Sequence, residues 1–125
     1  MAELPVPKQE QIIFEDKNLY ACLANYPIAK GHVVAVWKRD VSDLHLLKRK
    51  DYEHLMDVVD EVRNAMLAAL KIEKVYLIYM DETQHVHWHL VPRYNEKGLN
   101  VLEEKPKKLK EFGLAEKIKA KLELL

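Results

Sequence analysis

Three histidines, His85, His87 and His89, occupy alternate positions of the short apolar segment HVHWHLVPR. Imidazole is the side chain that titrates near neutral pH, so it can serve as an acid, a base, a nucleophile or a metal ligand. In an extended strand, alternate side chains point to the same side. The spacing therefore predicts a row of three imidazoles on one face of a strand, with the apolar residues between them packed on the core.

Three interpretations of this row are open. The histidines could be partly exposed polar residues without chemistry, which accounts poorly for three aligned rings. Two of them could bind zinc with a further ligand such as Asp81, Glu82 or His32. His85 and His89, however, lie about 13 Å apart along an extended strand, too far to share one ion. Alternatively, one imidazole could attack phosphorus and form a covalent intermediate, while its neighbours set its tautomer and disfavour protonation of all the rings together.

The composition narrows the class of protein. The 125 residues carry 20 basic and 20 acidic side chains, so the chain lacks the net positive charge that non-specific binding to nucleic acid or to an anionic membrane requires. The basic run from Lys105 to Lys110 is expected to be a solvated loop. The sequence has no recognisable leader and no run of about 18 apolar residues, so we expect a cytoplasmic protein. Cys22, the single cysteine, lies in an apolar run and is expected to be buried.

Hydrophobic periodicity predicts the elements that position the histidines within one domain, residues 1–125. Residues 1–11 are expected to be a mobile N-terminal segment. A long amphipathic helix is expected from Asp51 to Leu70, with Asp51 as its N-cap, and a second helix over residues 113–125. Short strands are expected at Ile12 to Glu15, Leu19 to Ala24, His32 to Lys38, Val75 to Met80 and His85 to Val91.

The strand that begins at His32 is the second candidate source of site residues. His32 and Val34 share one of its faces, so His32 can point toward the histidine row while Val34 lines an adjoining apolar pocket. Trp37 lies on the opposite face, where core packing is the favoured interpretation. His45 and His54 lie outside the row, and we assign them no chemistry.

The segment HVHWHLV resembles the motif of the histidine triad (HIT) nucleotide hydrolases and transferases, in which three histidines alternate with apolar residues. PIAKGHVV, starting at Pro27, is similar to the Pro-x-x-x-Gly-His segment of that family, and the long helix falls between the two motifs. The resemblance covers Ile12 to Arg93. Within the family, the segment looks most similar to the dinucleoside tetraphosphate hydrolase-like branches. It implies an α+β half-barrel with a five-stranded antiparallel sheet, one long helix and a C-terminal helix, and a homodimer formed through the long helix and a neighbouring strand.

The same resemblance implies a reaction at the α-phosphate of an adenine nucleotide, either a dinucleoside polyphosphate or an AMP-amidate. His87 would form a nucleotidyl-histidine that water hydrolyses to AMP, and His89 would contact phosphate oxygens or the leaving group. The main-chain carbonyl of His85 would accept the proton on the other nitrogen of His87, and His32 would lie beside the phosphates. This chemistry requires neither metal nor cofactor. A nucleotide-binding protein with little turnover and a metal-dependent hydrolase are the alternatives.

Two positions depart from the family's pattern. Ala24 stands where many members have Asn or Asp to bind the ribose. Asn25, one residue later, is therefore the candidate ribose ligand. A loop-capping role for Asn25 is an equally favoured alternative. The segment before the histidines, MDETQ, has no glycine, and Gln84 is its candidate nucleotide ligand. Glu82 is expected to face solvent or a cation, because a carboxylate beside phosphates is repelled.

Overall fold

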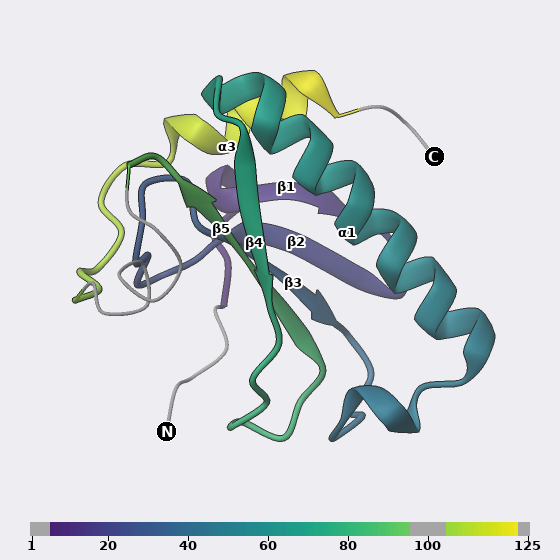
Figure 1. The fold of residues 1–125 in the computed structure, drawn as a ribbon. Helices are drawn as coiled ribbons and strands as arrows, with labels where there is room; N and C mark the ends of the chain where they lie inside the picture. Colours follow the sequence, from purple (N-terminus) through teal and green to yellow (C-terminus); the bar gives the residue numbers. More distant parts are fainter. Residues whose placement is uncertain (1–5, 96–104, 123–125) are drawn as a thin grey trace.

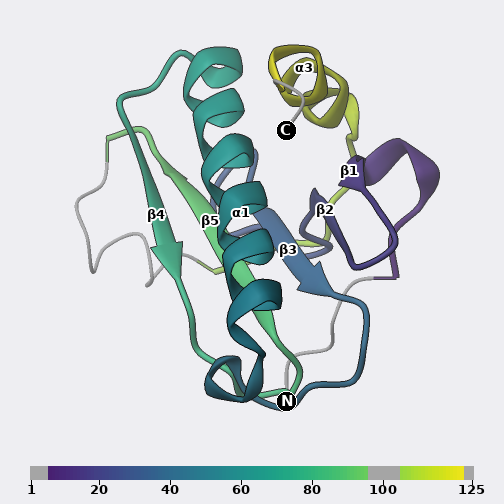
Figure 2. The same ribbon diagram turned by 90° about the vertical axis from the view of Figure 1, so that its right-hand side faces the viewer.

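The computed structural model describes residues 6–95 and 105–122, and in this part of the chain five strands form one antiparallel sheet in the order β1-β2-β3-β5-β4 (Figure 1). Two α-helices, α1 (Arg49–Leu70) and α3 (Gly113–Lys121), pack on one face of this sheet (Figure 2). The predicted α+β class, with an open five-stranded antiparallel sheet and two helices, is confirmed. The strands are β1 (Ile12–Glu15), β2 (Leu19–Leu23), β3 (Val33–Trp37), β4 (Lys74–Ile78) and β5 (His87–Arg93).

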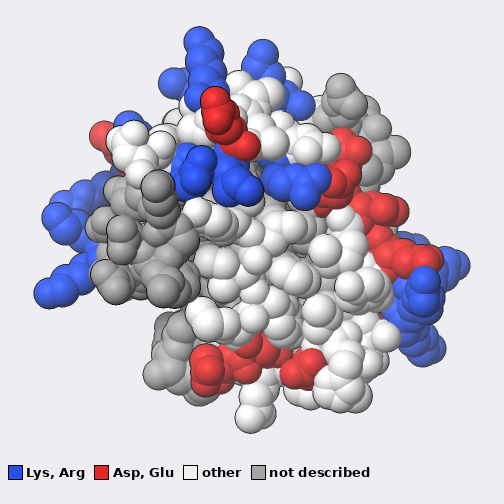
Figure 3. Space-filling view, viewed as in Figure 1, with Lys and Arg blue, Asp and Glu red and all other residues white. Residues whose placement is uncertain are grey.

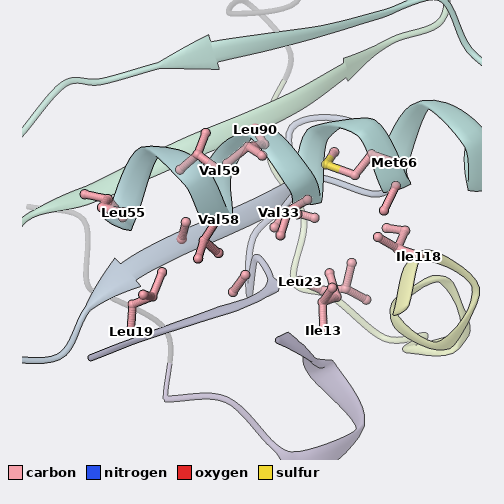
Figure 4. Packing of buried hydrophobic residues seen from close by; sticks show 14 of the residues in the cluster. Ile13, Leu19, Leu23, Val33, Leu55, Val58, Val59, Met66, Leu90 and Ile118 are labelled. Carbon is pink, nitrogen blue, oxygen red and sulfur yellow. The ribbon is translucent and has the colours of Figure 1, made fainter. Parts of the chain in front are cut away.

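The hydrophobic core lies between the sheet and the two helices (Figure 4). Helix α1 contributes buried residues at spacings of three and four, which is the signature of a helix with one apolar face: Leu55, Val58, Val59, Val62, Ala65 and Met66. Trp37 is fully buried in this core, as predicted. Val86 and Leu90 are also fully buried there, and Trp88 is half-buried against them. The apolar side of the histidine segment therefore fixes which way the other side faces.

Several predicted boundaries need correction. Helix α1 begins at Arg49 with Lys48 as N-cap, so Asp51 is not the cap; it lies in the first turn and pairs with Arg39 at 2.5 Å. Strand β5 begins at His87 rather than His85 and continues through Pro92 to Arg93. Pro92 lies beyond the last residue that pairs with β3, a position where a residue without an N–H is tolerated.

The two ends of the chain also differ from the prediction. Gln9–Gln11, within the segment expected to be mobile, forms a 3-10 helix, and the buried amide of Gln11 donates to the carbonyl of Leu23. Residues 1–5 lie outside the described residues. Helix α3 ends at Lys121, because Leu122 adopts an extended backbone, and residues 123–125 are again outside the described residues. Within the described part, neither α-helix is long and apolar enough to cross a membrane.

Gly31 is required by the loop that leads into β3. Its φ is +88°, and an added Cβ would come within 3.0 Å of a Leu70 methyl group on α1. We therefore expect Gly31→Ala to lower the free energy of unfolding by about 1 kcal/mol or more, measured by urea denaturation. Gly113 is the matched control, because a Cβ there meets nothing within 4 Å. If Gly31→Ala and Gly113→Ala have equal effects, this account of Gly31 is wrong.

Candidate active site

His87 and His89 project from β5 onto the sheet face that α1 and α3 leave open. In the pairing of β5 with β3, His87 lies opposite Val36 and His89 opposite Val34, and directly paired residues share a face. The two rings meet edge to face with their centroids 5.0 Å apart. His87 is only 4% exposed. Two members of the predicted imidazole row are therefore adjacent on one face.

His85 does not belong to the strand, which corrects the prediction of three rings on one strand face. It lies in the loop before β5, where its Nε2–H donates to the carbonyl of Trp37 at 2.5 Å. The main chain of the next residue, Val86, is bonded on both sides: its carbonyl accepts from the amide of Trp37, and its amide donates to Val41. The backbone around His85 is therefore held firmly against the end of β3.

The carbonyl of His85 determines the tautomer of His87. His87 Nδ1 lies 2.6 Å from that oxygen. A carbonyl only accepts hydrogen bonds, so the proton of neutral His87 must be on Nδ1. Nε2 of the neutral ring then carries a free lone pair. This is the nitrogen that would act as a nucleophile or accept a proton.

A second chain of hydrogen bonds determines the tautomers of His32 and His89. The amide N–H of Ile28 donates to His32 Nδ1 at 3.2 Å, so neutral His32 carries its proton on Nε2. That Nε2–H donates to His89 Nδ1 at 3.0 Å. Neutral His89 must then carry its proton on Nε2. The loop before β3 thus makes His89 a hydrogen-bond donor beside the lone pair of His87.

Burial keeps both of these rings neutral. Burial, and secondarily the neighbouring His89, lowers the pKa of His32 to about 3. Burial, and secondarily the neighbouring His87, lowers the pKa of His89 to about 4. Desolvation disfavours the charged imidazolium, and a second positive charge nearby adds to that cost. At neutral pH the hydrogen-bond chain therefore consists of uncharged rings with defined donors and acceptors.

These lowered pKa values predict a pH-dependent stability. An unfolded histidine has a pKa of about 6.5, so below that pH the unfolded chain binds more protons than the folded protein, and the free energy of unfolding falls. The stability that depends on neutral His32 and His89 is fully present above about pH 6.5, and it is lost as the pH falls toward about 4. We expect urea denaturation between about pH 7.5 and about pH 5, mostly above the range of carboxyl groups, to show this fall.

The variant His32→Gln is expected to show a shallower dependence of unfolding free energy on pH, because it removes one of the two depressed imidazoles. Leu46 is exposed and has no titratable group, so Leu46→Gln serves as the control with an unchanged slope. Equal slopes in all three proteins would contradict this assignment.

An apolar wall adjoins the two rings on the open face. It consists of Val34, Val36 and Ala24, with Tyr20 packed against them. Val34 is 3% exposed and lies directly opposite His89 across the strand pair. The predicted association of an apolar patch with His32 and the histidine row is therefore present. Cys22, also on β2, is buried as predicted, and burial raises the pKa of its thiol to about 12.

Asn25 lies just after β2, where it ties three segments together. Its Oδ1 accepts from the side-chain amide of Gln11 at 3.0 Å, and its carbonyl accepts from the amide of Leu109 at 2.6 Å. Asn25 therefore has a structural role, but through bonds to two distant segments rather than through the loop capping that the sequence left open. A ribose contact by Asn25 stays a prediction.

The turn before the histidines is organised by Asp81, which the sequence interpretation missed as a positioning residue. Its carboxylate accepts from the hydroxyl of Tyr79 at 2.9 Å and from the amide of His85 at 3.0 Å. Gln84 is exposed and has a φ of +58°, and Glu82 is exposed to solvent. An aspartate that opens a turn commonly accepts bonds from the backbone after it, which is the signal that could have found Asp81.

His45 and His54 lie away from this cluster. His54 on α1 bonds Asp16 at 2.7 Å, and His45 bonds Asp43 at 2.8 Å, so each is paired locally. Among residues 6–95 and 105–122, no group of three or more His, Cys, Asp or Glu side chains is arranged to hold a metal ion.

The comparison with protein families agrees with this geometry: a model of the HIT domain matches residues 7–96. The chain belongs to the HIT domain family. No curated protein sequence matches the chain significantly. The family match includes β1 to β5 and α1, and so contains His32, His85, His87 and His89.

Solved structures of HIT proteins share the fold. A histidine triad protein from Sinorhizobium meliloti has a TM-score of 0.77 at 19% identity over 89% of this chain and 88% of its own. A hypothetical histidine triad nucleotide-binding protein from Sulfolobus tokodaii gives 0.68 at 21% identity over 89% and 79%. A diadenosine triphosphate hydrolase from Plasmodium falciparum gives 0.71 at 13% identity over 95% and 80%. At these identities the similarity establishes the HIT fold.

Proposed function

We propose that this HIT protein hydrolyses adenine nucleotides at the α-phosphate through a covalent nucleotidyl-His87 intermediate, with dinucleoside polyphosphates or AMP-amidates as substrates. The observation that carries this proposal is the 2.6 Å contact between His87 Nδ1 and the carbonyl of His85. It leaves the Nε2 lone pair of a buried imidazole available for attack. Nucleophilic catalysis needs such an unprotonated nitrogen together with a neighbour that orients the ring.

In the first step, Nε2 of His87 forms a bond to the α-phosphorus, and the bond from phosphorus to the leaving group breaks. The leaving group departs with the electron pair of that bond. His87 keeps its Nδ1 proton and becomes positively charged, and the hydrogen bond to the His85 carbonyl strengthens with that charge. His89 donates its Nε2–H to the phosphate oxygens or to the leaving oxygen, where negative charge develops.

In the second step, a water oxygen forms a bond to phosphorus, the bond from phosphorus to Nε2 breaks, and a proton of the water passes to solvent. AMP is released and neutral His87 is restored. The wall of Val34, Val36 and Tyr20 supports the choice of a nucleotide, because it offers an apolar surface for a base beside the imidazoles. Asn25 and Gln84 are the proposed polar contacts to the nucleotide.

The experiment that tests this function is an assay of AMP release from a panel of dinucleoside polyphosphates and adenosine phosphoramidate, with and without a chelator. We expect release that the chelator does not change, and an intact-mass measurement during turnover that detects the protein plus one AMP group. Activity that is lost with EDTA and restored by zinc would favour a metal-dependent hydrolase. Tight AMP binding without turnover of any substrate would favour a nucleotide-binding protein.

We also propose that the protein is a homodimer formed through α1 and β4. Strand β4 pairs only with β5 in the described sheet, so its other edge is open to a further strand. The face that carries β4 and the adjoining side of α1 is largely free of charged side chains (Figure 3). Such uncharged patches are typical of protein interfaces.

Light scattering coupled to gel filtration is expected to give about twice the 14.7 kDa mass of one chain. A monomer mass at micromolar concentration would contradict the dimer. This result would leave the proposed reaction untouched, since the four histidines lie within one chain.

A further inference from the structure

A cavity of about 660 Å³ lies beside the candidate active site and has no role in the chemistry above. It is bounded by the loop Pro27–Gly31, which leads into β3, and by the segment 105–117, which includes the start of α3. The two segments lie side by side in Figure 1, and the 2.6 Å bond from the Leu109 amide to the Asn25 carbonyl joins them. This volume is typical of sites for small organic ligands.

The rim of the cavity is strongly basic although the whole chain is neutral. Six lysines line it against a single acidic residue, Glu111. The lysines come from three parts of the sequence: Lys30 from the loop, Lys117 from α3, and four from the run Lys105 to Lys110. The run is exposed, as predicted, but the fold brings two further lysines to it. Lys and Arg side chains gather at the left edge of Figure 3, where Figure 1 places this segment.

No described carboxylate forms a salt bridge with any of these six lysines. Like charges this close repel one another, and an anion with several negative groups removes that repulsion. The cavity is also lined by apolar residues, among them Leu23, Ile28 and Leu114. Basic side chains together with apolar ones fit an organic anion that carries several phosphates and one apolar ring system.

The cavity also reaches the histidines. His32 lines it, and the ring centroids of His32 and His89 lie 5.1 Å apart. His89 in turn lies 5.0 Å from His87. His32 thus adjoins both the cavity and the histidine cluster, so a phosphate chain that extends from the phosphorus attacked by His87 past His89 and His32 would reach the cavity that the lysines line.

We propose that this lysine-lined cavity binds the leaving nucleotide of a dinucleoside polyphosphate, with its phosphates on the lysines and its base against the apolar residues of the lining. The proposal rests on the proposed function of His87 and selects among its substrates. A dinucleoside polyphosphate has a leaving group that can use the cavity, whereas a phosphoramidate releases only ammonia and cannot.

The test uses a triple variant, Lys30→Gln, Lys108→Gln and Lys117→Gln, which removes one lysine from each segment. The control variant, Lys17→Gln, Lys50→Gln and Lys119→Gln, removes the same charge from exposed positions that do not line the cavity. We expect kcat/KM for diadenosine tetraphosphate to fall about 10- to 100-fold in the cavity variant, as the loss of several charge-assisted contacts implies. The same ratio for adenosine phosphoramidate should stay within about twofold, and the control should match the wild type for both substrates.

Equal changes for the two substrates, or no change for either, would overturn the assignment of the cavity. Calorimetric titration with ATP, the leaving nucleotide of diadenosine tetraphosphate, tests the cavity without turnover. We expect its Kd to rise about tenfold in the cavity variant and not in the control. If no substrate is hydrolysed but ATP binding depends on these lysines, the proposed reaction fails and the anion site stands. If inorganic tripolyphosphate alone binds in a lysine-dependent manner, and neither ATP binding nor the kinetics depends on them, the cavity takes a free oligophosphate and the leaving-nucleotide assignment is wrong.

Discussion

Replacing His87 by alanine is expected to lower kcat/KM for AMP release about 10⁴-fold or more, on the scale of losing a catalytic nucleophile. The reason is specific to this ring, because only His87 combines an Nδ1–H held by a carbonyl with an unbonded Nε2 among the described histidines. A steady-state assay with diadenosine tetraphosphate measures the loss. The protein plus one AMP group should also disappear from intact-mass spectra of the variant.

His45→Ala is the matched control for this experiment. His45 is exposed, and its only described side-chain partner is Asp43, remote in sequence from the triad, so we expect wild-type turnover. Circular dichroism and thermal unfolding of both variants verify that the fold is retained. If His87→Ala turns over nearly as fast as the wild type, or still accumulates the AMP adduct, His87 is not the nucleophile.

Much of the fold could be predicted from local patterns. The spacing of Leu55, Val59, Val62 and Met66 specified a helix with one buried face, and the alternation around His87 specified a strand with one apolar side. Both patterns depend only on the periodicity of regular structure, and the structure has both elements.

The sequence could not specify the arrangement that gives the histidines different roles. His85 leaves the strand face because its ring bonds the carbonyl of Trp37, a residue 48 positions away. The tautomer of His89 depends on an amide at Ile28, through His32. Such long-range contacts follow from loop conformations, which have no periodicity to be recognised in a sequence.

The lysine-lined cavity illustrates the same limit. The run Lys105 to Lys110 has the composition of a solvated loop, and its lysine side chains are exposed. Its proposed role arises only because the bond between Leu109 and Asn25 places the run against Lys30 and the loop that ends at His32. Charge that is balanced over the chain is thereby concentrated at one place beside the histidines.

His89→Ala is expected to lower kcat for diadenosine tetraphosphate about 10²- to 10³-fold, the usual effect of removing one oriented donor to developing negative charge. His32 determines that His89 is a donor. Because the Nε2–H of His32 donates to His89 Nδ1, the proton of neutral His89 is on Nε2. We therefore expect His32→Phe to cause a smaller loss, since the His89 ring remains but its tautomer is no longer fixed.

Steady-state assays near neutral pH, where both rings are neutral in the folded protein, measure these losses. A substrate with a leaving group that is stable as an anion, the p-nitrophenyl ester of AMP, identifies the atom that His89 serves. If His89 bonds the leaving oxygen, its removal costs less with this ester, because the charge is delocalised over the nitrophenyl ring. Unchanged turnover of His89→Ala with both substrates would refute the donor role, and the hydrogen bonds from Ile28 through His32 to His89 would then serve only the structure.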